Sequence, residues 1–412
     1  MVRIIAFEFR KNFIKPSIFI ALLIFSVISI MKIHGVYAEN SLFARGLPYE
    51  KSVQIKELYW TMYEEFGGEI TLDKINRLLD IYRPIEAKVA DRTASTAENN
   101  PDTYTGNFYH DYFFFDKCLV KPMEHDYMYK SYADEVVSNA QANVDFYQSV
   151  GNSYEARKNS ILANNFSGRQ VENFYFTEMY QYYTHYDFSS FLILLLCLYG
   201  LVSVFVSEKE VDMDSLLLTT PMGGVHTVAG KIMASALFVV AVCSWFELLD
   251  FLAFGVIFGS FEGSQAPLYA IKNFADTILN VNIGQYSLLS TALKTAGMLV
   301  LSLGFLLLSC IFRNGLFPFG CGLAGAFGLM VWQSTFMGSG YLWGKILNPF
   351  MLLVNREFFR KSEFVNILNF PVSSYAVALC ASTLWAVAFA VGIRLTVLRS
   401  TIPQKGSAAH AL

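Results

Sequence analysis

Six long apolar stretches constrain this chain more than any other feature of its sequence. A helix needs about 20 apolar residues to cross the roughly 30 Å hydrocarbon core of a bilayer. The stretches are residues 17–31 with an extension to 37, 188–206, 232–246 with a continuation to 261, 295–312, 314–344 and 371–393. Of the 412 residues, 16% are charged, against about 25% in soluble domains. The sequence therefore predicts an all-α polytopic membrane protein with six transmembrane helices.

Basic residues near the ends of these stretches predict how the chain is oriented. Threading six spans in order places Arg10, Lys231, Arg313 and Arg394 on one side of the membrane. Short cytoplasmic connections carry an excess of lysine and arginine. We therefore expect both termini in the cytoplasm and the long connection between the first two spans on the opposite, outer side.

Composition divides the chain into four parts. We expect an N-terminal helix along the inner membrane surface and the first span in residues 1–37, an outer domain in 38–186, five further spans in 187–398, and a cytoplasmic tail in 399–412. The first twelve residues mix apolar and charged side chains, which is typical of an interfacial helix. A frayed terminus is the alternative.

Residues 38–186 are polar enough to lie in water and show helical periodicity. Apolar residues recur at three- and four-residue spacing over 49–66, 70–90, 124–150 and 154–166. Seventeen of the 23 tyrosines fall here, either as a packed core and interfacial belt or as a surface for a peptide or lipid ligand. Three histidines stand beside acids, but no zinc-binding motif accompanies them, so we expect no metal site.

The connection 207–231 is short and strongly acidic. It carries Glu208, Glu210, Asp212 and Asp214, followed by three leucines that include Leu217 and Leu218. This order is typical of a short amphipathic helix, which Pro221 and the following glycines would end. A solvated connection without a partner is the alternative.

At these residues the chain resembles the permease subunits of type-2 ABC exporters. Their loop between spans two and three reads approximately Glu-x-Gly-Thr-x-Glu-x-Leu-Leu-x-x-Pro and continues into Gly-Lys. Glu210, Leu217, Leu218 and Pro221 match this pattern by spacing, and Gly230-Lys231 supplies its end. Asp212, Met213 and Ser215 depart from it, which puts the individual docking contacts in doubt. The large insert is similar to those of Gram-positive peptide and lantibiotic-type export permeases.

The resemblance implies a bacterial plasma-membrane exporter that is not itself an enzyme. The acidic loop would dock on a separate ATPase subunit, which would bind ATP and Mg, and a second permease subunit would complete the pathway. The chain has no GxxxxGK[ST] phosphate-binding loop and would carry no cofactor of its own. The substrate would be a peptide or an amphipathic, lipid-like molecule, and nothing indicates a nucleic-acid partner.

The spans also contain a group of charged residues and a row of small residues. Glu247, Asp250 and Lys294 fall at similar depths near the outer edge of the bilayer core. We expect them to form a structural ion pair or to lie exposed at the interface. The functional alternatives are a polar site at the exit of the pathway and a proton-linked site. Small residues at Gly320, Ala324 and Gly328 share one face of the fifth span. They favour close helix packing, either at a dimer axis or within the subunit.

Residues 339–370 are too polar to cross the bilayer and too apolar for a free loop. We expect short helices that enter the outer interface in a re-entrant manner. Two other classes of protein remain as alternatives. One is a membrane receptor or sensor whose outer domain binds a ligand, and the other is an intramembrane enzyme, for which the spans lack a HExxH or GxSxG motif.

Overall fold

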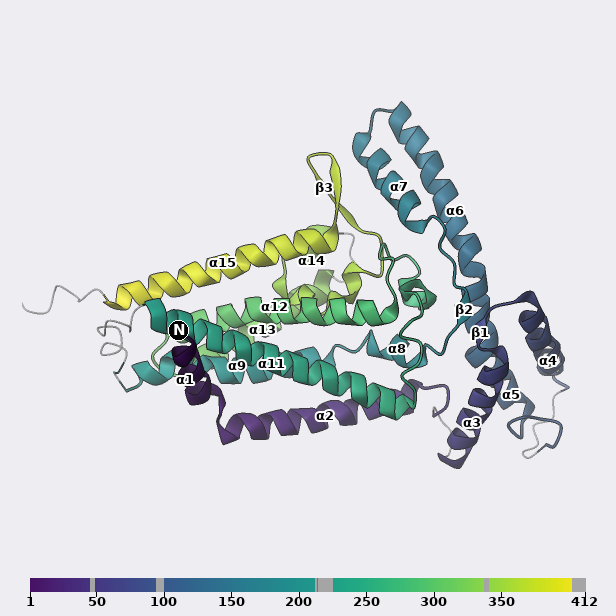
Figure 1. The fold of residues 1–412 in the computed structure, drawn as a ribbon, viewed down its shortest axis with the longest axis horizontal. Helices are drawn as coiled ribbons and strands as arrows, with labels where there is room; N and C mark the ends of the chain where they lie inside the picture. Colours follow the sequence, from purple (N-terminus) through teal and green to yellow (C-terminus); the bar gives the residue numbers. More distant parts are fainter. Residues whose placement is uncertain (45–48, 94–99, 212, 214–224, 337–340, 402–412) are drawn as a thin grey trace, which may run out of the picture.

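The computed structural model describes residues 1–44, 49–93, 100–211, 213, 225–336 and 341–401. Within these ranges six helices are long and apolar enough to cross a membrane, which confirms the six predicted spans. They lie roughly side by side along the long axis of the molecule (Figure 1). These helices are α2 (Pro16–Asn40), α9 (Phe188–Lys209), α11 (Val225–Phe258), α12 (Ile283–Ile311), α13 (Leu316–Phe336) and α15 (Ser374–Thr401).

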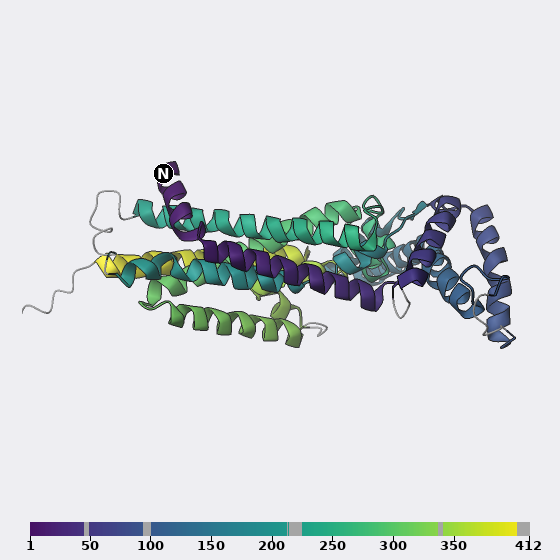
Figure 2. The same ribbon diagram turned by 90° about the horizontal axis from the view of Figure 1, so that it is seen from below.

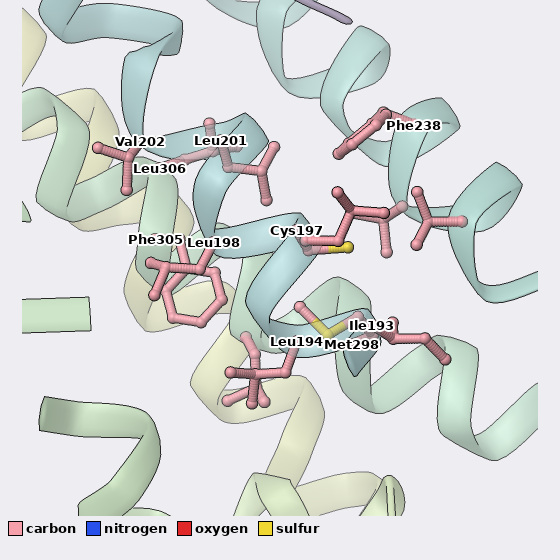
Figure 3. Packing of buried hydrophobic residues seen from close by; sticks show 14 of the residues in the cluster. Ile193, Leu194, Cys197, Leu198, Leu201, Val202, Phe238, Met298, Phe305 and Leu306 are labelled. Carbon is pink, nitrogen blue, oxygen red and sulfur yellow. The ribbon is translucent and has the colours of Figure 1, made fainter. Parts of the chain in front are cut away.

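Helix α9 is the centre of the bundle. Its most apolar window is 78% buried, against 22% for α2 and 17% for α13, so the last two present apolar side chains outward. Figure 3 shows Cys197 and Leu198 of α9 between Phe238 of α11 and Phe305 of α12, and Leu194 further along α9 in the same cluster. A largely enclosed α9 and outward-facing α2 and α13 are consistent with a bundle surrounded by lipid.

Helix α1 (Val2–Phe13) forms as predicted, but one side of it packs on the bundle. Phe13 stacks on Phe238 with ring centroids 4.3 Å apart, and Glu8 and Asn12 are buried. A methyl group at Gly230 of α11 would lie 2.6 Å from Cγ2 of Ile4, so the glycine permits this close crossing. Figures 1 and 2 show α1 turned away from the direction of α2. Its predicted place in the membrane interface stays a prediction.

The insert between α2 and α9 is mainly helical, as predicted. It extends beyond the opposite end of the bundle from α1 (Figure 1). Asn107 and Asn152 accept backbone N–H bonds as N-caps of α5 and α7, and Gly151 with φ +73° permits the turn between α6 and α7. The helices are α3 (Tyr49–Phe66), α4 (Leu72–Ala90), α5 (Phe108–Phe114), the π-helix η1 (Phe115–Val120), α6 (Lys121–Ser149), α7 (Ser153–Phe166) and α8 (Glu178–Tyr183).

Two parts of the insert have separate hydrophobic cores. Phe66, Leu78, Phe115 and Phe174 belong to a core among α3, α4 and η1, which the two-stranded pair β1 (Gly68–Glu69) and β2 (Asn173–Phe174) closes. A second core joins Tyr129 of α6 and other side chains of the insert to the ends of α11 and α12 nearest the insert and to the short 3₁₀ helices η2 (Leu268–Ala270) and η3 (Lys272–Phe274). The insert is therefore attached to the bundle by apolar packing.

The segment before α15 is only partly helical, which the sequence did not indicate. It contains α14 (Leu342–Ile346), η4 (Pro349–Leu352) and η5 (Asn355–Phe358), followed by an antiparallel hairpin of β3 (Phe364–Ile367) and β4 (Phe370–Ser373). Arg157 of α7 donates to the carbonyl of Asn369 at 3.1 Å and stacks over Phe370. The hairpin thus braces the α6–α7 pair instead of forming another short helix.

Candidate functional site

An ionic cluster closes the end of the bundle from which the acidic loop leaves. Glu208, near the end of α9, accepts from Nζ of Lys11 at 2.6 Å and lies 2.7 Å from Nζ of Lys231. These three residues, which we call the clasp, come from α1, α9 and α11. The clasp therefore fixes the N-terminal helix to both helices that flank the acidic loop.

The two lysines of the clasp are not equivalent. The Lys231 side chain is 2% exposed, donates to the carbonyl of Val204 at 2.9 Å and lies over the ring of Phe205, whereas the Lys11 side chain is 35% exposed. A buried ion whose partner is removed is strongly destabilising, whereas an exposed pair contributes little. Lys231 is therefore the structural member of the clasp.

Of the acidic loop, the structure describes only its flanks. Glu208 is engaged inside the clasp, and Oε1 of Glu210 accepts the backbone N–H of Gly315, at the start of α13, at 3.0 Å. Asp212, Asp214, Leu217, Leu218 and Pro221, all predicted to contact an ATPase, lie outside the described residues. Glu208 and Glu210 thus hold the ends of the loop to the bundle. The ATPase-docking role predicted for them stays a prediction.

The predicted group of Glu247, Asp250 and Lys294 is brought together at the other end of the bundle, but its pairing is selective. Nζ of Lys294 on α12 lies 2.9 Å from Oε1 of Glu247 on α11, and Thr291 donates to Oε2 at 3.2 Å. Both side chains of the ion pair are nearly buried, at 13% and 8% exposed. The pair joins α11 to α12 across the bundle.

Asp250 is held by hydroxyl groups instead of by the lysine. Ser29 of α2 donates to Oδ1 of Asp250 at 2.9 Å, and the Tyr186 hydroxyl donates to the carbonyl of Ser29 at 3.2 Å. Asp250 is 2% exposed. This chain of hydrogen bonds ties α2, α11 and the end of the insert together. Nearby, Arg356 forms an ion pair with Asp187 at 2.6 Å, although burial still raises the pKa of that carboxyl.

The small residues of α13 do not pack inside the subunit. Gly320, Ala324 and Gly328 are exposed, and a methyl group added at either glycine would meet nothing within 4 Å. The close approach to α9 occurs instead at Gly322, where an added methyl group would lie 2.4 Å from Leu198. The sequence left two roles open for these residues, packing at a dimer axis and packing within the subunit. The structure shows no close contact within the subunit at Gly320 or Gly328.

Sequence reasoning identified the acids of the site but missed several of their partners. Lys11 and Glu208 are 197 positions apart, and Ser29, Tyr186 and Asp250 come from three different segments. For the partners of Glu208, the sequence offered one signal, the Gly230-Lys231 pair at the start of a span. Lys231 is one of the two lysines that Glu208 contacts. Across the described ranges, no three His, Cys, Asp or Glu side chains gather closely enough to hold a metal ion.

Comparison with known proteins adds no further constraint. No protein-family model, curated protein or solved structure matches the chain.

Proposed function

We propose that this chain is the permease subunit of an ATP-driven exporter whose acidic loop receives movement from a separate ATPase. The clasp is the observation that carries this proposal. A force applied to the loop between α9 and α11 would reach α9 at Glu208, α11 at Lys231 and α1 at Lys11 together, because the three side chains are joined by ion pairs. Such a connection converts a local push into the movement of three helices.

The orientation follows from the same proposal. The clasp, the acidic loop and both termini would face the cytoplasm, where ATP is hydrolysed, and the insert would face outward. Lys11, Lys209, Lys231 and Arg313 all lie at or beside the clasp end, which agrees with the bias of basic residues toward the cytoplasm. A peptide or an amphipathic, lipid-like substrate would leave the membrane next to the insert.

A second copy of the chain, or a related permease, would complete the pathway. The exposed small-residue face of Gly320, Ala324 and Gly328 permits the close helix approach that membrane dimers use. The apolar outer side of α2 is the other surface that a partner or lipid would cover.

The test is purification of the tagged full chain from native membranes, with the ATP hydrolysis of the eluate measured and its subunits identified. We expect a subunit that carries a GxxxxGK[ST] motif and hydrolyses ATP. A stable, folded chain that elutes without such a subunit would overturn the proposal. Co-elution of a kinase or another signalling protein would favour the receptor alternative.

A further inference from the structure

A cavity lies where the insert meets the segment between α11 and α12. Its volume is about 820 Å³, and it is bounded by α6, α8 and the chain around residues 42–43, 174–178 and 270–276. Binding sites for small molecules typically occupy about 300–1,000 Å³ and are lined mainly by apolar and aromatic groups. The cavity is separate from the clasp, the Glu247–Lys294 pair and the Asp250 network, because none of their residues lines it.

Aromatic side chains form much of the cavity wall. Tyr129 stacks on Tyr269 with ring centroids 4.5 Å apart, and its hydroxyl donates to the carbonyl of Ala275 at 3.0 Å, so this part of the wall is held in place. Aromatic faces bind both apolar groups and cations. The other aromatic residues of the wall include Phe43, Tyr59, Tyr132, Phe174, Phe176 and Tyr182.

Two buried carboxylates in the wall have no cationic partner among the described residues. Asp126 is 7% exposed and Glu178 is 8% exposed, and neither forms an ion pair within 4 Å among the residues that the structure describes. Asp126 also accepts no hydrogen bond there, whereas Oε1 of Glu178 accepts the N–H of Leu42 at 3.0 Å. Burial raises the pKa of Asp126 well above its usual range and raises that of Glu178 to about 7.

The lysines that line the cavity form no ion pair with Asp126 or Glu178 in the described part of the chain. Lys117 and Lys121 line the cavity, but their ammonium groups lie 3.2 and 2.9 Å from the same oxygen of Asp116, which does not line it. Lys272 is exposed, and the Coulombic effect of Lys56 on Glu178 is smaller than that of burial. An unpaired buried carboxylate is costly unless a cation or a hydrogen-bond donor reaches it. The cavity therefore combines an aromatic wall with two buried acids that, within the described ranges, form no ion pair.

We propose that the cavity binds an amphipathic cation, with its amine at Asp126 and Glu178 and its apolar body against the tyrosine and phenylalanine side chains. A primary amine on an aromatic or aliphatic body, such as a lysine side chain or the amino terminus of an apolar peptide, has this chemistry. The inference does not depend on ATP-driven export, because a receptor would bind the same class of ligand.

The test uses dansylcadaverine, which joins a primary amine to an aromatic body, and its N-acetylated form, which keeps the body and loses the charge. Binding to the full chain in lipid nanodiscs is measured by fluorescence anisotropy, with empty nanodiscs as the blank. We expect saturable binding of the amine. Acetylation and Asp126→Asn should each weaken it about tenfold or more, since each removes a charge-assisted contact.

Asp134→Asn is the matched control, because Asp134 is an exposed aspartate of the same helix that does not line the cavity. This variant should bind the amine as the wild type does. Asp126→Asn should fold, since it replaces a buried carboxyl group with an amide of nearly the same shape, and the amine should raise the Tm of the wild type but not of this variant. Equal binding of the amine and its acetylated form, absence of saturable binding, or unchanged binding by Asp126→Asn would each overturn the inference.

Discussion

The buried acids at the two ends of this molecule differ in whether they are paired with a lysine. At the clasp, Glu208 is shared between Lys11 and Lys231, whereas at the cavity Asp126 and Glu178 are buried without any lysine or arginine within 4 Å in the described ranges. A paired buried charge holds helices together, and an unpaired one favours a ligand that brings the missing charge. The difference separates a mechanical connection from a binding site.

Among the substitutions that test this difference between paired and unpaired acids, we expect Lys231→Met to lower the stability most. Removing the more buried lysine leaves Glu208 largely desolvated, so we expect a loss of about 3–5 kcal/mol in stability. Thermal unfolding of variants that also carry Cys321→Ser and Cys380→Ser is followed with a thiol-reactive dye. It measures this loss because those two cysteines are exposed, whereas Cys197, Cys243 and Cys310 are buried in the fold. Adding Glu208→Gln should restore a large part of it, and a Lys231→Met variant of wild-type stability would contradict the role of the clasp.

Lys294→Met should be the next most damaging change, at roughly 3 kcal/mol, because it leaves Glu247 unpaired at membrane depth. The structure predicts which second substitution restores stability. Glu247→Gln should do so, since Glu247 is the partner at 2.9 Å, whereas Asp250→Asn should not, since Asp250 is held by Ser29. Unfolding temperatures of the two double variants, compared with Lys294→Met, decide between these acids.

Glu178 should make stability depend on pH with a sign opposite to that of a salt-bridged acid. Burial raises its pKa from 4.5 to about 7, so the folded state binds a proton more tightly than the unfolded state does. The contribution of Glu178 is therefore fully present below about pH 4.5 and is lost as pH rises through 7. Between pH 5 and 8 the loss should be roughly 2 kcal/mol, and Glu178→Gln should remove this part of the pH dependence of the Tm.

The smallest effect should come from Lys11→Met. Its side chain is 35% exposed and shares Glu208 with a better buried lysine, so we expect about 1 kcal/mol or less. The same unfolding assay as for Lys231→Met compares the two. Equal losses for the two lysines would mean that α1 is as firmly fixed by charge as α11 is.

Much of the fold could be predicted from the sequence because its signals are local. Hydropathy identified all six spans, and periodicity gave α3 at Tyr49–Phe66 with its bounds unchanged. Helix α11 continues past Glu247 and Asp250 because both acids find partners on neighbouring helices. The β3–β4 hairpin was missed because its contacts, such as Arg157 with Asn369, come from a distant segment.

The candidate sites were less predictable than the fold for the same physical reason. A carboxylate in the sequence does not reveal whether a lysine 197 residues away will reach it, as Lys11 reaches Glu208, or whether none will, as at Asp126. Burial and pairing are set by packing among segments, and these two properties distinguish the clasp from the cavity.

The most direct measurement is the ATP hydrolysis that co-purifies with the full chain when the acidic loop is altered. Asp212→Lys combined with Asp214→Lys reverses charge in the loop and leaves the clasp residues intact, and Glu64→Lys reverses an exposed acid of the insert as a control. We predict that the loop variant folds with a wild-type Tm and loses the ATPase, while the control retains it. Undiminished ATPase association with the loop variant would contradict coupling through this loop.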